Sequence, residues 1–103
     1  MKIIKKLCKM IDEELDDACN YIQQALKYKE DYPSVAKAFA TLSEEEMGHV
    51  GILHGEVTKL IEAHRREHGE PPETMKAVYD YLHEQHIEKA NRVRMYQDQY
   101  RNY

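Results

Sequence analysis

Two residues in the stretch LSEEEMGHVGIL, positions 42–53, have side chains that bind metal ions and a spacing that brings them together. Glu46 and His49 are three positions apart, and residues at that spacing are neighbours on a helix surface. At about 100° per residue, Glu46 falls near the centre of the apolar arc of its helix and His49 lies about 60° away, whereas Glu44 and Glu45 point off that line. An unpaired ionised carboxylate in a core is costly, so Glu46 requires a partner, and a metal ion is one.

A second carboxylate has the same relation to the preceding amphipathic segment. Glu14 lies inside the apolar arc of that segment, about 60° from Ile11, while its acidic neighbours point elsewhere. Carboxylate oxygens terminate or bridge two cations, and a neutral imidazole nitrogen completes a coordination shell. The mixture of Glu14, Glu46 and His49 therefore indicates ligands for iron or manganese.

A metal-free interpretation stays open beside this one. A Glu in a helix usually belongs to a solvated face, and a His on an apolar face is usually a core residue with a satisfied hydrogen bond. Glu46 and His49 then pair with each other or with Lys89, in a helical bundle that serves interaction or structure. A third interpretation keeps the same ligands for a zinc or storage site without redox turnover.

Two short breaks divide the chain into three helices. Apolar residues recur at helical spacing up to KEDYPS, where Pro33 suits the first turn of a new helix. The next break is HGEPPE, in which Gly69 suits a helix C-terminus and the two prolines cannot continue the helix. We expect helices over about 2–30, 33–67 and 73–101, within a single domain of residues 1–103.

The predicted fold class is all-α, with three long antiparallel helices. Each helix spans about 40 to 50 Å, and breaks this short make sequential neighbours antiparallel. The commonest stable arrangement of long antiparallel helices has four of them around a shared core. The chain is therefore one helix short, and we expect dimerisation to complete a four-helix bundle.

The combination of Glu14, Tyr21 and the Glu-x-x-His of Glu46 and His49 resembles the ferritin-like superfamily, especially its rubrerythrin-like branch. The resemblance covers about residues 10–62, and Glu14 and Glu46 are separated by 32 positions. It implies a ferritin-like helical hairpin with a dinuclear iron or manganese centre that oxidises Fe(II) or reduces peroxide, as an oxidoreductase. Tyr21, two turns after Glu14, is expected to hydrogen-bond a ligand carboxylate.

The third helix departs from that family's pattern. Members with a complete site in one chain carry a second Glu helix and a second Glu-x-x-His helix, and this chain has no fourth helix. The polar residues in the apolar arc of the third helix are Gln85, His86 and Lys89. His86, or His83 at the edge of the arc, is thus the remaining candidate ligand, and the absence of a central carboxylate favours a helix packed outside the site.

Two copies of the first two helices around a two-fold axis supply the missing ligands. They give four Glu and two His, the complement of di-iron carboxylate bundles, in an arrangement similar to that of small encapsulated ferritins. We therefore expect a homodimer or a higher even-numbered oligomer. Gly48, Gly51 and Gly55 lie opposite Glu46 and cost roughly 1 kcal/mol each relative to Ala, so either another helix approaches there or the surface tolerates them.

Composition excludes several other classes. A formal net charge of −4 argues against a nucleic-acid-binding surface, and the chain has no apolar run long enough for a signal peptide or a membrane span. Cys8 and Cys19 are eleven positions apart, or about 16 Å along one helix, which is too far for a disulfide. They are typical of reduced, buried thiols, so we expect a cytoplasmic protein without membrane or nucleic-acid partners.

Overall fold

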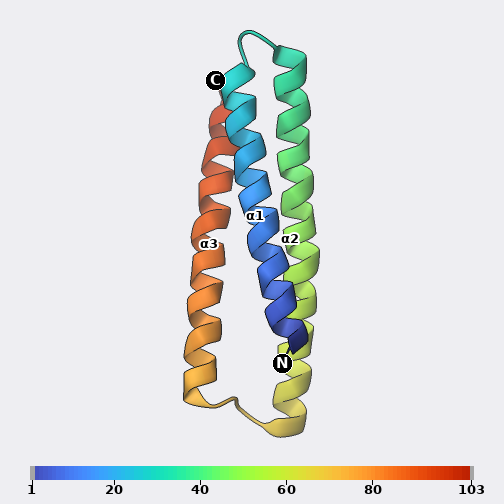
Figure 1. The fold of residues 1–103 in the computed structure, drawn as a ribbon, viewed down its shortest axis with the longest axis vertical. Helices are drawn as coiled ribbons and strands as arrows, with labels where there is room; N and C mark the ends of the chain where they lie inside the picture. The colour runs from blue at the N-terminus through green and yellow to red at the C-terminus, as the bar shows by residue number, and fades with distance from the viewer. Residues whose placement is uncertain (1, 103) are drawn as a thin grey trace.

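The computed structural model describes residues 2–102, and this part of the chain forms three helices joined by two short connections (Figure 1). The helices are α1 (Lys2–Tyr28), α2 (Pro33–His68) and α3 (Glu73–Asn102). The prediction of an all-helical chain with three helices is confirmed. The first helix ends two residues earlier than expected, and the second and third each extend one residue further.

Local sequence explains where α2 begins and ends. Pro33 is the first residue of α2, a position where its fixed φ angle and missing N–H group have no cost. At the other end Gly69 adopts a φ of 75°, a conformation that glycine reaches without strain, and its N–H donates to the Arg65 carbonyl at 2.8 Å. Pro71 and Pro72 follow, so the chain turns there into α3.

The three helices form an elongated bundle in which consecutive helices are antiparallel, and α1 lies between α2 and α3 in Figure 1. The described chain measures 55 × 18 × 18 Å. α1 packs along both of the other helices, whereas α2 and α3 touch at few points. α1 is therefore the element that holds the bundle together.

The core follows from that central position. α1 contributes more buried residues than either neighbour, in the sequence Ile4, Ile11, Leu15, Ala18, Ile22 and Ala25. On α2 the buried residues are mostly small, namely Ala36, Ala40, Ser43 and Val57. The apolar side expected for α2 is therefore only partly buried. Val57 lies in the core and Phe39 packs against the core, whereas Val35 and Leu42, nearer the start of the helix, are exposed.

A chain of two buried hydrogen bonds links all three helices. The Ser43 hydroxyl on α2 donates to the Ala18 carbonyl on α1 at 2.7 Å, and Gln97 Nε2 on α3 donates to Ser43 Oγ at 3.1 Å. Ser43 is fully buried and Gln97 nearly so. These bonds satisfy polar atoms that would otherwise be desolvated without a partner.

Lys89 attaches α3 to α1 through two carboxylates. Its Nζ donates to Asp12 at 2.7 Å and to Asp16 at 2.8 Å. Burial lowers the pKa of Lys89, but the hydrogen bonds to Asp12 and Asp16 outweigh it, so the pKa lies above its ordinary value. α3 therefore docks on the side of α1 that carries these two aspartates.

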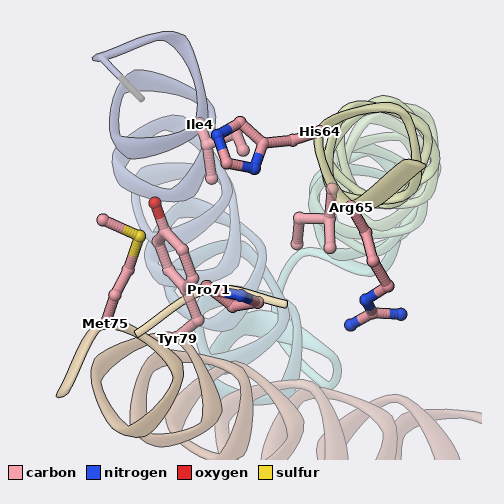
Figure 2. A pocket seen from close by; sticks show the side chains of 7 residues that line it. Ile4, His64, Arg65, Pro71, Met75 and Tyr79 are labelled. Carbon is pink, nitrogen blue, oxygen red and sulfur yellow. The ribbon is translucent and has the colours of Figure 1, made fainter. Parts of the chain in front are cut away.

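The bundle is closed at the end where α2 turns into α3. A cavity of about 60 Å³ lies there, surrounded by Met75 and Tyr79 of α3, His64 of α2 and Ile4 of α1, with Pro71 beside it (Figure 2).

Over residues 2–102, none of the three helices carries an apolar stretch that would span a bilayer.

Candidate metal centre

The structure brings Glu14, Glu46 and His49 together. One ligand atom from each residue lies within 4.8 Å of those of the other two. Glu14 lies 14 residues before the end of α1 at Tyr28, and Glu46 lies 13 residues after the start of α2 at Pro33. An antiparallel hairpin with arms this similar in length places the two carboxylates at the same level along the bundle.

The imidazole of His49 is the group that contacts both carboxylates. Its Nδ1 lies 3.3 Å from Glu14 Oε2 on α1 and 3.8 Å from Glu46 Oε1 on its own helix. The side chains of Glu14 and Glu46 are 26% and 17% exposed, and that of His49 is 54% exposed. The two carboxylates thus lie at the edge of the core, and the imidazole covers them from the solvent side.

The spacing and the chemistry of these donors fit a metal ion. Bonds from oxygen and nitrogen ligands to a transition metal are about 2.0–2.2 Å long, so ligands on opposite sides of one ion lie a little over 4 Å apart. The three ligand atoms all lie within 4.8 Å of one another, so small shifts of these side chains would place them around one ion. Two carboxylates and one imidazole supply the mixed oxygen and nitrogen donors that suit iron and manganese.

The same three atoms also form a contact without metal. In the tautomer that carries its proton on Nδ1, His49 donates a hydrogen bond to Glu14 across the two helices. Lys89 takes no part in this contact, because its Nζ pairs with Asp12 and Asp16. The metal-free interpretation therefore retains the pairing of His49 with the carboxylates, and the alternative pairing with Lys89 is wrong.

Exposed apolar side chains accompany the group on both helices. Ile3 and Met10 precede Glu14 by 11 and 4 positions, and Val35 and Leu42 precede Glu46 by the same two intervals. Intervals of 4 and 11 positions return to the same side of a helix to within about 40°. These four residues and the three candidate ligands together form what we call the open face, which α3 leaves uncovered because it packs on the Asp12 and Asp16 side of α1.

Tyr21 shares this side of α1 with Glu14 but contacts an aromatic ring. It is half-buried, and its ring packs against that of Phe39 with 6.2 Å between centroids and 27° between planes. The contact fixes the Tyr21 ring between α1 and α2. A hydrogen bond from Tyr21 to a ligand carboxylate stays a prediction.

The structure does not bring His86 to the other candidate ligands. Among residues 2–102, the group of three metal-binding atoms within 4.8 Å contains neither His86 nor His83. Both residues lie on α3, where His83 stacks on His54 with 5.4 Å between ring centroids. The physical reason is the docking side of α3, which puts its histidines across α1 from Glu14.

The cysteines and glycines fall outside the group. Cys8 and Cys19 are free and half-buried, and burial raises the pKa of both thiols. A Cβ atom built on Gly48, Gly51 or Gly55 meets no heavy atom within 4 Å. No helix of the described chain therefore approaches these glycines closely.

Three features were not anticipated from the sequence. His49 was expected to point into a core, and in the single chain its side chain is more than half exposed. The equal intervals of the open-face residues before Glu14 and Glu46 were a signal that this side belonged to an apolar surface shared by two helices. The contact of His54 with His83 had no such signal, because it depends on how α3 is placed beside α2.

Comparison of the chain with protein-family models, with curated proteins and with solved structures found no match.

Proposed function

We propose that this chain is a ferritin-like metal-binding protein whose dinuclear iron or manganese site is assembled between two protomers. The observation that carries the proposal is the convergence of Glu14, Glu46 and His49 within 4.8 Å on the open face. Each protomer would contribute two carboxylates and one imidazole. Two copies give four Glu and two His, the set that di-iron carboxylate bundles use.

The open face supports a second copy as the partner. Ile3 and Met10 on α1 and Val35 and Leu42 on α2 are exposed apolar side chains next to a half-complete ligand set. Pairing about a two-fold axis would bury these residues against their own copies and give α1 and α2 the two further helices of a four-helix bundle. The buried apolar area would favour association.

Metal binding and association are expected to depend on each other. Two open faces brought together without metal would place four carboxylates in one partly buried site, and like charges at that distance repel. A metal cation neutralises this repulsion, so it favours the dimer. In turn, the dimer completes the ligand set, which raises metal affinity.

A dinuclear iron centre supplies one-electron redox chemistry at each ion, which suits Fe(II) oxidation or peroxide reduction. The chain's own residues set the conditions for it. Glu14 and Glu46 would supply the negative charge that holds a cation there, and Nδ1 of His49 lies close to both carboxylates. Tyr21 would hold the Glu14 carboxylate in place from the same side of α1.

The test is metal analysis combined with mass in solution. Protein expressed with ample iron is expected to contain about one metal per chain in an even-numbered oligomer. Glu46→Ala is expected to lose the metal, and Glu45→Ala, its exposed neighbour, is expected to keep it. Anaerobic Fe(II) loading followed by air should then give a ferric-oxo absorbance in the wild type. Wild-type protein without metal, or equal loss in both variants, would contradict the proposal.

The direct contact of His49 Nδ1 with Glu14 Oε2 at 3.3 Å favours one alternative, a metal-free helical interaction protein. It predicts no stoichiometric metal and an unchanged or raised stability for Glu46→Ala. A zinc or storage protein is a further outcome of the same experiment. It would bind metal through the same ligands but give no ferric-oxo absorbance on exposure to air.

A further inference from the structure

A second group of nitrogen donors lies between α2 and α3. His54 on α2 stacks on His83 on α3 with 5.4 Å between ring centroids and 24° between planes. His86 follows His83 by three positions, so it lies next to it on the α3 surface. None of the three belongs to the group formed by Glu14, Glu46 and His49.

All three histidines line the same two cavities. One cavity has a volume of about 350 Å³ and is also lined by Cys8 and Ile11 of α1. The other has a volume of about 270 Å³ and includes Gly51 of α2 in its wall. The space exists because α2 and α3 touch at few points and Gly51 has no side chain to fill it. The imidazoles therefore border room for an ion and its water ligands.

The surroundings keep these donors suited to metal binding. Burial lowers the pKa of His86, which favours the neutral imidazole, the form that coordinates a metal. The Cys8 thiol also lines the larger cavity, but burial raises its pKa and so disfavours the thiolate that binds metal, which leaves the imidazoles as the donors. Three imidazoles form a softer donor set than the carboxylates of the open face, and this set suits Zn²⁺ better than manganese.

We propose that His54, His83 and His86 form a second metal site. The site is selective for a divalent ion that prefers imidazole nitrogen, and Zn²⁺ is the ion that it binds. Nitrogens of all three rings do not lie within 4.8 Å of one another in the stacked arrangement. The His54 and His83 side chains are exposed, so the two rings can leave the stack and direct one nitrogen each to a common point. The bound ion would join α2 to α3.

This site does not rest on the proposed function. It uses none of the open-face residues, and it draws its ligands from α2 and α3 instead of α1 and α2. Its role is structural: it would fix α3 against α2 in the region where protein contacts between the two helices are few. Zn²⁺ would then raise the stability of the folded chain, because it binds the folded state in preference to the unfolded one.

The experiment uses the full chain with Glu46→Ala and His49→Ala, so that the open-face ligands are removed. Titration calorimetry with Zn²⁺ alone is expected to show about one ion bound per chain. Adding His83→Ala is expected to weaken binding at least about tenfold, and to abolish the rise in thermal midpoint that Zn²⁺ causes. Helical content measured by circular dichroism checks that each variant folds.

The matched control is His64→Ala. His64 and His68 form another contacting pair on α2, with 4.7 Å between ring centroids, and this pair is the competing zinc ligand set. Zinc affinity that is kept in His64→Ala and lost in His83→Ala supports the proposal. Affinity lost in His64→Ala, kept in His83→Ala, or absent from the parent chain overturns it. Iron binding by the wild type is measured separately, so the two proposals fail independently.

Discussion

At the scale of single residues, the contact of His49 with Glu14 brings two metal-binding side chains together. It contributes little to the stability of the fold. The imidazole is 54% exposed, so water screens its interaction with the carboxylate 3.3 Å away. Exposed pairs of this kind contribute at most about 1 kcal/mol to the free energy of unfolding. The contact therefore orients a donor atom more than it holds the two helices together.

We accordingly expect Glu14→Gln to change the unfolding free energy of metal-free protein by less than about 1 kcal/mol. The control is Glu13→Gln, since Glu13 is the neighbouring residue and its side chain is exposed. Urea unfolding after chelation measures both variants. Destabilisation of Glu14→Gln well beyond that of Glu13→Gln would show that the carboxylate has a structural role.

At the scale of elements, the buried hydrogen bonds through Ser43 fix how the helices sit against each other. Ser43→Ala removes the hydroxyl that accepts from Gln97, and leaves a buried amide without that acceptor. We expect a loss of about 1–3 kcal/mol in unfolding free energy, measured by urea titration. Thr41→Ala removes an exposed hydroxyl that bonds only within α2, to the Lys37 carbonyl, and it should cost far less. Equal losses would contradict this account.

Lys89 gives the α1–α3 contact a defined dependence on pH. Its folded pKa is raised above the ordinary value of 10.5, so its contribution to stability is fully present below that pH. The contribution is lost as the pH rises through the folded pKa and the amine loses its charge. Lys89 is 31% exposed, and its partners Asp12 and Asp16 are more exposed. These ion pairs therefore contribute at most about 1 kcal/mol to the free energy of unfolding.

The measurement is the difference in urea stability between wild type and Lys89→Met at several pH values. We expect that difference to be constant from about pH 7 to 9 and to shrink above about pH 10.5. Lys59→Met is the control, since Lys59 pairs only with Glu56 on its own helix and both side chains are well exposed. A difference for Lys89→Met that grows at high pH would contradict the assigned ion pairs.

Helix boundaries were largely predictable, and the side on which α3 docks was not. Pro33 and the segment from Gly69 to Pro72 act locally, through φ angles and missing N–H groups, so sequence alone locates them. Glu14 and Glu46 lie at the same height along the bundle because the two arms of the hairpin are similar in length, which the sequence also predicts. By contrast, helical periodicity shows that α1 has an apolar side but not which neighbour covers which part of it. Ser43 was accordingly not expected in the core, nor His49 on the surface.

At the scale of the whole molecule, a bundle 55 Å long and 18 Å wide buries only a modest core. α2 contributes mainly small residues to it, and the open face leaves larger apolar side chains exposed. A second copy on this face would supply the burial that one chain lacks. The proposed dimer thus has an energetic reason apart from its ligands.

Charge placed on the open face is expected to block that association. Leu42→Glu should shift the mass in solution from an even-numbered oligomer toward a single chain and lower the iron content with it, because a carboxylate would be buried without a partner. Met95→Glu places the same charge on an exposed apolar position of α3 and should change neither. Sedimentation velocity measures the mass. An oligomer that survives Leu42→Glu would show that the open face is not the interface.

α3 docks on α1 and makes few contacts with α2, and this arrangement also affects the order in which the helices unfold. The hairpin of α1 and α2 holds most of the contacts between helices, so α3 is the segment whose departure disrupts the least packing. Glu14, Glu46 and His49 all belong to the hairpin and none to α3. A transient state with α3 released would therefore keep the ligand group intact, and α3 would be free in that state to exchange between neighbouring copies.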